Sequence, residues 1–561
     1  MVRRGREHTL RTFTLRSPLI VGAAISTLVC VNTAHAEVES DGLRGRAPVD
    51  AGAHPPENPS LSEPTEQIEP TANNMDEFEL LGVTIAGAQS IPVSSLSDNY
   101  EGYLTHRVSI EDLSVIAQAI TDQYRAEGYF LSRAVVPPQT PDSGVAQIVV
   151  IEGRIDEVVF EGDAAAQVAP YFAGLTEAGA VSLPDLERRL TLARDVPGIE
   201  VKSRVEPHPD DPSTHRLVIE AAAERVHAYT SIHNRGSNSA GPVQTSVGLD
   251  VRSVFHPRDQ LSFFALATPE EVSEFALMQL GYSVVGAGGD RFGASVLGFQ
   301  SEDGSDDGSP ELGGDGATFT VFYEHPLLRR RRQGLWLGGA FDARHVRYDW
   351  SNGGGYEDQL RVARLSLRGF FNENGRSTSF WTQASFGLDA LGASGRSQTR
   401  RSRASADAQF LKLNARGTYY MDIGRHFGIY GQADLQASSD ALLYSEELSL
   451  GGARYGRAYN YGEISGDHGV AGSAEFRAGY NPSADSITFA QAYAFLDGGQ
   501  VWNLDAGGSD AALASVGLGA RITLWDAMTL SAELARPMTR TPYQEGDKDW
   551  RSFFGVTAVY P

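Results

Sequence analysis

Strict alternation of apolar and polar residues dominates the chain from about residue 226 onward, where the helical period is absent. In the segment FLKLNARGTYYMD, Leu411 and Leu413 share one face with Tyr419, while Lys412 and Arg416 share the other. Successive side chains of a β-strand point to opposite faces, so this period predicts strands. The apolar faces carry small and aromatic residues, and the opposite faces carry charge.

The connections between these strands alternate in length. Short links such as FHPR, NENG and DIGR alternate with long ones, including the whole of residues 439–469, and we count about sixteen strands. A soluble β-sandwich would show the same apolar alternation. Short turns on one side, long loops on the other and an even strand number are typical of an outer-membrane barrel. Residues 225–561 are therefore predicted to form a sixteen-stranded antiparallel transmembrane β-barrel.

Two smaller units precede the predicted barrel, at residues 76–153 and 154–224. Each shows the order strand, helix, strand, strand, which describes two small α+β domains in tandem. In the first unit, Ser109 and Asp112 form a capping-box pattern at the start of a helix, and Gly128 is placed to end it. The second unit contains a similar helix in SLPDLERRLTLARDVPG.

The N-terminal residues 1–36 are predicted to be a signal peptide. Basic residues precede the apolar run from Leu19 to Val31, and AHA at 34–36 fits cleavage between small residues. A membrane anchor is the alternative, but the run is short of the ~20 residues that a spanning helix needs. Cleavage would remove Cys30, the only cysteine, so no disulfide is expected. Residues 37–75, rich in proline and glutamate, are predicted to be a linker without a packed core.

Composition and motifs argue against an enzyme and against a nucleic-acid partner. The formal net charge of −24 disfavours binding to a phosphate backbone. The segment GDHG, with Asp467 and His468, offers one carboxylate and one imidazole but no second histidine at ligand spacing. No phosphate-binding glycine loop, HExxH or GxSxG is present. We predict no catalytic residue, no metal site and no cofactor.

The basic run Arg329–Arg332 lies in a short turn of the predicted barrel. It could be a solvated charge run, or it could contact the acidic tandem units.

Two segments of the tandem units carry a family resemblance. GYFLSRAVVPPQ, at 128–139, and VVIEGRIDEVVFEG, at 149–162, resemble the POTRA domains of two-partner secretion transporters, the TpsB family. The resemblance extends over linker, tandem units and barrel. It implies two POTRA domains in the periplasm and a barrel in the outer membrane.

Two motifs of the wider superfamily also match. Its sixth extracellular loop carries Arg-Gly-aromatic, which reads GRAY here, so Arg457 and Tyr459 match while Ala458 replaces the glycine. A later strand carries Phe-x-Asp-x-Gly, which reads FLDGG and supplies the following residues: Phe495, Asp497 and Gly499. The resemblance implies that contact between the two motifs fixes the loop.

The alternation of the strand supports that pairing. Asp497 falls on the face opposite Leu496 and so is predicted to point into the lumen. A long loop that folds into the lumen would place Arg457 beside it, and we expect a bidentate ion pair. The alternative is two unrelated solvated charges.

The resemblance implies a pore that secretes one large, unfolded partner from the periplasm to the cell exterior. The partner would be an adhesin, cytolysin or exoprotein, and outer-membrane lipid would surround the barrel. An extended substrate could add to an open strand edge of a POTRA domain. Four residues lie on or near such a strand, unless they are simply core: Phe130, Leu131, Val135 and Val136. A barrel-protein insertion or assembly factor is the main alternative, and a passive porin or receptor is another.

Overall fold

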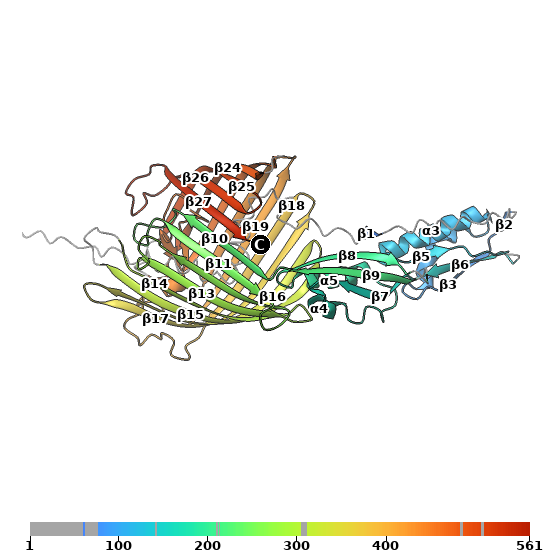
Figure 1. Ribbon diagram of the computed structural model, residues 1–561, viewed down its shortest axis with the longest axis horizontal. Helices are drawn as coiled ribbons and strands as arrows, with labels where there is room; N and C mark the ends of the chain where they lie inside the picture. Colours follow the sequence, from blue (N-terminus) through green and yellow to red (C-terminus); the bar gives the residue numbers. More distant parts are fainter. Residues whose placement is uncertain are drawn as a thin grey trace, which may run out of the picture.

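The computed structural model describes residues 77–560 except 141–142, 209–210, 212–213, 305–310, 483–485 and 506–509, and also a short strand at Ser60–Leu61. Two α+β units follow one another from the end of a β-barrel, with the first unit farthest from the barrel (Figure 1). The predicted signal peptide, 1–36, lies outside the described residues, as does all of the predicted linker except Ser60–Leu61.

The first unit packs one long helix on a small sheet. Its elements are β2 (Phe78–Glu79), β3 (Gly82–Ala86), the 3-10 turns η1 (Val93–Asn99) and η2 (Glu101–Tyr103), β4 (Arg107–Val108), α3 (Ile110–Ala126), β5 (Arg133–Val135) and β6 (Val145–Ile151). The sheet order is β3-β6-β5, and β2 pairs separately with β4.

Helix α3 begins and packs as its sequence predicts. Ser109 and Asp112 form the predicted capping box, in which the Ser109 side chain accepts from the Asp112 N–H at 3.2 Å. The apolar positions at helical spacing are fully buried against the sheet: Leu113, Ile116, Ile120 and Tyr124.

The second unit has its own core and a larger sheet. Its elements are β7 (Arg154–Glu161), α4 (Ala165–Val168), the 3-10 turn η3 (Ala169–Phe172), α5 (Leu183–Arg194), β8 (Ile199–Pro207) and β9 (Thr214–Ala223). None of the described helices in either unit is long and apolar enough to cross a membrane.

One strand of the second sheet comes from the predicted linker. The sheet order is β1-β8-β9-β7, where β1 (Ser60–Leu61) pairs in parallel with Arg204 and Val205 of β8. The prediction of a linker without a packed core did not anticipate this pairing. Pairing at a sheet edge uses backbone groups, so it leaves no apolar pattern in the sequence.

The barrel closes from sixteen antiparallel strands, which confirms the predicted strand number and the predicted barrel. The strands in order are β10 (Val226–His233), β11 (Gln244–Arg252), β12 (Asp259–Ala267), β13 (Phe275–Val285), β14 (Arg291–Ser301), β15 (Leu312–Arg330), β16 (Gln333–Trp350), β17 (Gly355–Glu373), β18 (Arg376–Gly387), β19 (Phe410–Ile423), β20 (Phe427–Ser438), β23 (His468–Tyr480), β24 (Ile487–Trp502), β25 (Ala511–Leu524), β26 (Met528–Pro537) and β27 (Arg551–Tyr560). β10 pairs with β27 from Ala228–Tyr560 to His233–Gly555 and thereby closes the cylinder.

The predicted two faces of the strands are those observed. Leu413 is 53% exposed on the outside of the barrel, whereas its neighbour Lys412 is 6% exposed and points inward. Leu496 is likewise exposed beside the buried Asp497. An apolar exterior around a polar interior is the arrangement that a lipid bilayer requires of a barrel.

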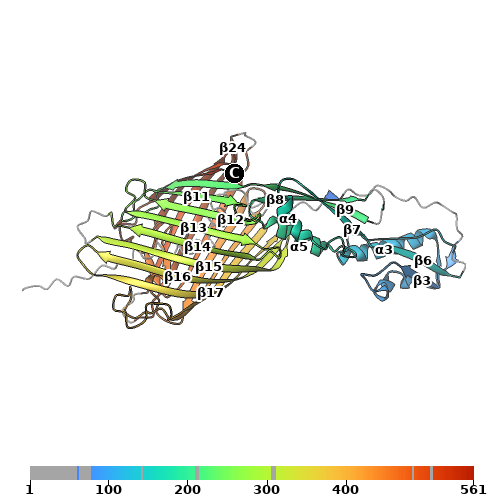
Figure 2. The ribbon, with the colours of Figure 1, turned by 60° about the horizontal axis from the view of Figure 1, so that its bottom comes forward.

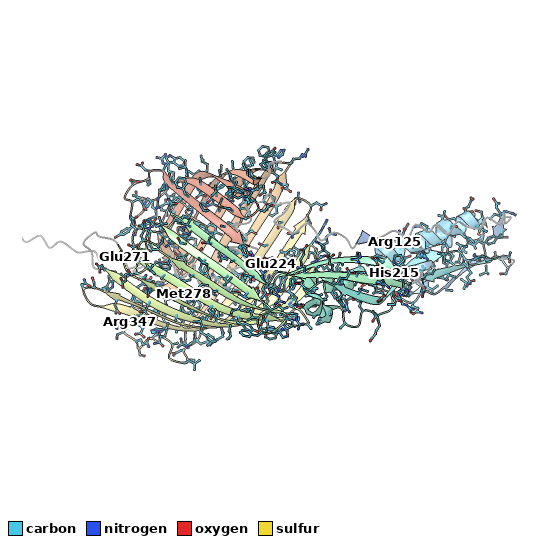
Figure 3. All side chains as sticks on the ribbon, in the orientation of Figure 1. Arg125, His215, Glu224, Glu271, Met278 and Arg347 are labelled. Carbon is cyan, nitrogen blue, oxygen red and sulfur yellow. The ribbon has the colours of Figure 1, made fainter. Side chains whose placement is uncertain are left out.

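The α+β units identify the two ends of the barrel. β10 begins soon after β9 ends, so its first residue lies at the end that carries the units (Figure 2). In Figure 3, Glu224 marks this junction, while Glu271 and Arg347 mark the opposite end. The short turns are at the junction end and the long loops at the other, except that Ser351–Gly354 is short because β16 and β17 extend farther.

Candidate functional site

The long loop of residues 439–467, between β20 and β23, lies inside the barrel; we call it the lumen loop. It contains the 3-10 turn η4 (Tyr444–Glu446) and the two-stranded sheet of β21 (Leu448–Leu450) and β22 (Ile464–Gly466). Its apolar residues Tyr455 and Tyr459 form a core with Phe495 of β24 and Leu513 of β25. The loop is therefore packed against the barrel wall rather than spread over the outside.

The lumen loop places Arg457 among three carboxylates of the wall, which we call the acidic sector: Glu475 of β23, Asp497 of β24 and Glu533 of β26. Arg457 is 4% exposed. Its Nη2 donates to Glu475 Oε1 at 2.6 Å, and its Nη1 donates to Glu533 Oε2 at 3.3 Å. The guanidinium lies over the ring of Phe495, 4.2 Å from its centroid. Buried charge–charge hydrogen bonds of this kind are strong and directional.

Asp497 meets Arg457 in a different way from the predicted bidentate pair. The Arg457 Nε lies 3.1 Å from Asp497 Oδ2, with the geometry of an ion pair rather than a hydrogen bond. The other oxygen, Oδ1, accepts from the backbone N–H groups of Gly456 and Arg457 at 2.8 and 3.3 Å, and from the hydroxyl of Ser515. The prediction of a bidentate pair was wrong, because one oxygen of Asp497 is occupied by the loop backbone and only the other faces the Arg457 guanidinium.

Tyr459 and Gly499 complete the contact between the two motifs. The Tyr459 hydroxyl donates to the carbonyl oxygens of Ala514 and Arg540 at 3.2 and 3.1 Å. A Cβ at Gly499 would lie 2.5 Å from the Val470 carbonyl oxygen and 2.7 Å from Leu450 Cδ1 of the loop. Only glycine lets the lumen loop approach the wall this closely.

A second group of buried charges ties the same loop to another part of the wall, and the motif search did not find it. Glu446 of η4, 2% exposed, meets Arg344 of β16, Arg364 of β17 and Lys412 of β19, which we call the basic sector. The inward position of Lys412 was predicted from the alternation of its strand. Its partner Glu446 lies in a loop, where no alternation indicates the direction of a side chain.

The segment GDHG is structural. The buried carboxylate of Asp467 accepts from Arg403 at 2.7 and 3.1 Å and from the N–H of Leu442 at 2.7 Å. Arg403 belongs to the outer loop between β18 and β19, so this tie joins two loops. Across the described ranges, no three His, Cys, Asp or Glu residues are grouped so that they could hold a metal ion.

The four residues suggested for substrate binding fall in two places. Val135 lies on β5, at an edge of the first sheet, and Val136 follows it. Phe130 and Leu131 are not on a strand: they lie in the turn after α3 and pack against the core of the second unit. For these two residues the alternative that they are simply core holds, because their side chains are used at the joint between the two units.

Beside the lumen loop the barrel retains a cavity of about 1040 Å³. Its lining includes Gln383 of β18 and Asn414 of β19, together with Glu446, Ser449 and Tyr455 of the lumen loop. The loop therefore narrows the lumen and borders the remaining space.

Two sequence families match the chain. The family "POTRA domain, ShlB-type" matches residues 78–153, and "Haemolysin secretion/activation protein ShlB/FhaC/HecB" matches residues 216–522. The first unit is thus a POTRA domain, and the second match covers most of the barrel.

Two curated relatives with transporter names match about 70% of this chain and a similar share of their own length. The heme/hemopexin transporter protein HuxB of Haemophilus influenzae is 22% identical over 396 residues, covering 69% of this chain and 70% of that protein. The outer membrane transporter CdiB of Dickeya dadantii is 24% identical over 420 residues, covering 72% of each.

Solved structures share the fold. CdiB from Escherichia coli superimposes with a TM-score of 0.74 at 19% identity, covering 98% of this chain and all of that one. CdiB from Acinetobacter baumannii gives a TM-score of 0.66 at 15% identity. With a secretion-family match over more than half of its 561 residues, a POTRA domain and a closed barrel, the chain belongs to the haemolysin secretion/activation protein family ShlB/FhaC/HecB and is an outer-membrane transporter that secretes a partner protein.

Proposed function

We propose that this transporter carries one large, unfolded, β-rich partner to the cell exterior and that the lumen loop closes its path between transport events. The buried Arg457 network carries the proposal: one guanidinium joins the loop to three carboxylates on three strands. An extended chain needs space that the loop now occupies, so the loop must leave the wall during transport. The family is a transport family rather than a class of enzymes, and its match supports secretion over barrel assembly.

We also assign the five segments of the chain. Residues 1–36 act as the signal peptide and 37–75 as the linker, followed by POTRA domains at 76–153 and 154–224 and the barrel at 225–561. For the second POTRA domain, the support is its element order and its separate core around α5. The exposed apolar side chains on the outside of the barrel, such as Leu413 and Leu496, support contact with outer-membrane lipid.

Substrate recognition is assigned to the first unit. β5 is an edge strand whose partner on the inner side is β6, so an extended segment of the secreted protein can add to its open side. Val135 and Val136 lie on or beside this edge, whereas Phe130 and Leu131 hold the two units together. The partner belongs to the classes of large exported adhesins, cytolysins or exoproteins.

The decisive experiment is deletion of this transporter, followed by comparison of periplasmic and secreted proteins. One large protein should accumulate in the periplasm, disappear from the medium and return on complementation. An unchanged secreted fraction would refute the proposal. A general loss of outer-membrane barrels would instead support an assembly factor.

Heat-dependent migration of the transporter on a denaturing gel is the accompanying check that the barrel is inserted.

A further inference from the structure

We propose that Glu446 is a second positioning residue, which latches the lumen loop to the basic sector independently of Arg457. This inference rests on the proposed role of the loop as a closure. It adds that closure depends on two buried ion networks. In one, the loop carboxylate Glu446 binds the basic sector, and in the other, the loop guanidinium of Arg457 binds the acidic sector.

The contacts of Glu446 come from three different strands. Its Oε1 accepts from Arg364 Nη2 at 2.7 Å and from Arg344 Nη1 at 3.2 Å. Its Oε2 accepts from Lys412 Nζ at 2.6 Å. Lys412 Nζ also donates to the Glu446 carbonyl oxygen at 2.9 Å, and Arg344 Nη1 donates to the Ser445 carbonyl oxygen at 2.9 Å. Both the side chain and the backbone of η4 are therefore held.

The basic sector carries an excess of positive charge when the loop groups are left out. In the basic sector, Arg344, Arg364 and Lys412 face the wall carboxylate Asp342, which binds Arg364 at 2.5 Å. Three cations against one carboxylate leave two positive charges in excess. Glu446 supplies part of the missing negative charge.

In the acidic sector the loop supplies the cation instead. Three arginines of the wall face Glu475 and Glu533: Arg477 binds Glu475 at 2.6 Å, Arg235 binds Glu533 at 2.5 Å, and the charge of Arg521 acts on Glu475. Asp497 receives its cation from the loop, since Arg457 lies 3.1 Å from it. Each loop residue thus meets three wall groups of opposite charge.

Burial strengthens both ion networks, and each contributes to holding the loop against the wall. Glu446 and Arg457 are 2% and 4% exposed, and a buried charge that loses its partner is far less stable than the intact pair. Removal of the Glu446 charge would leave the three cations of the basic sector facing one another around a neutral amide. In the barrel order, the strands that bind Glu446 lie before β20 and those that bind Arg457 lie after it. Breaking one network therefore leaves the contacts of the other in place.

The test is Glu446→Gln in the full-length transporter, purified and reconstituted in planar bilayers. The open-to-closed ratio of the channel should rise at least about tenfold over wild type, which corresponds to ~1.4 kcal/mol. The matched control is Glu373→Gln, at an exposed position at the junction end of β17, which should behave as wild type. An unchanged ratio in a barrel with normal heat-dependent migration would overturn the proposal.

A second readout follows the loop itself. The hydroxyl of Ser449 in β21 is buried in the closed state, and Cys30 is the only native cysteine. A Ser449→Cys protein should react slowly with a membrane-impermeant maleimide, and adding Glu446→Gln should speed the reaction at least about tenfold. Lys412→Met removes one of three cations and should give a smaller increase, which keeps the proposal testable if Glu446→Gln does not fold. Equal labelling rates in all folded variants would contradict the latch.

Independence of the two latches is tested by combining variants. Glu446→Gln with Arg457→Ala should open the channel more than either change alone, with effects that multiply, since the sites share no contact. A double variant that matches Arg457→Ala alone would show that Glu446 holds nothing further. Neither readout requires a partner protein, so this inference can fail while secretion is established, and the reverse.

Discussion

Arg329, near the end of β15, donates two hydrogen bonds to Asp195, at the end of α5: Nε to Oδ2 at 2.6 Å and Nη2 to Oδ1 at 2.7 Å. The guanidinium also lies 5.4 Å from the ring centroid of Trp336 and 5.5 Å from that of Phe370. Of the two alternatives left open for the basic run, a solvated charge run or a contact with the tandem units, this pair favours the contact. The second unit is thereby docked on the barrel rim.

Asp195→Asn should loosen that docking. The change removes the negative charge of Asp195 and one of the two oxygens that accept from Arg329. The interaction between the second unit and the barrel should weaken by about 1–3 kcal/mol. Spin labels at the exposed positions Asp156 and Glu373 should then show a broader distance distribution by pulsed electron resonance. Glu177→Gln, at an exposed position of the second unit, is the control and should leave the distribution unchanged.

Arg457→Ala should nearly abolish export while the barrel still inserts. The substitution leaves three carboxylates without their shared cation, and breaking a buried ion network costs about 3–5 kcal/mol. Arg457→Lys should export at an intermediate level, because one ammonium cannot reach three acceptors as a guanidinium does. Immunoblots of the medium measure export, with Arg425→Ala in an exposed turn as the control. Normal export by Arg457→Ala would remove this network from the mechanism.

Gly499→Val should detach the lumen loop from β24. Its Cβ would lie 2.7 Å from Leu450 Cδ1 of the loop and 2.5 Å from the Val470 carbonyl oxygen, which is fixed in the neighbouring strand β23, so the loop side chain has to move away. Overpacking of this kind costs about 1–3 kcal/mol or more. We expect increased uptake of a large hydrophilic antibiotic in cells that carry the variant. Gly431→Ala, whose nearest contact would be an ordinary 3.8 Å, should leave uptake at the wild-type level.

Glu152 should make the stability of the POTRA domain depend on pH. Its carboxylate accepts from the N–H groups of Gln89 and Ser90 at 2.8 and 2.7 Å and from the Tyr124 hydroxyl at 2.9 Å. Burial raises the pKa of Glu152, but these hydrogen bonds outweigh it, so the pKa is lower than usual. The ionised Glu152 therefore stabilises the folded domain fully above its pKa in the unfolded chain, about 4.3. This stabilisation is lost as the pH falls through the lower pKa of Glu152 in the folded domain.

The matching variant is Glu152→Gln, which should cost the domain about 1 kcal/mol at neutral pH and nothing at low pH. Calorimetry of the full-length protein measures the unfolding transition of this domain. That transition is identified as the one that disappears when residues 77–153 are deleted. Glu101→Gln, at an exposed position of η2, is the control. A constant difference between wild type and Glu152→Gln at all pH values would argue against ionisation as the cause.

The elements and the faces of the strands could be predicted from the amino-acid sequence. Alternation placed Lys412 and Asp497 inside the barrel and Leu413 outside, and the capping box at Ser109 placed the start of α3. These features are local, because each depends on residues within one strand or one helical turn. The count of sixteen strands followed from the same period and from the lengths of the links.

The pairing of the buried charges could not be predicted from the sequence, because it depends on the folded barrel. Glu446, Glu475 and Glu533 are far apart in the chain from most of their partners, and a loop residue such as Glu446 has no period that assigns its direction. The pairing of β1 with β8 was equally hidden, because backbone hydrogen bonds at a sheet edge require no particular side chains. Charge complementarity across a closed barrel depends on the position of every strand, so it becomes visible only when the whole wall is assembled.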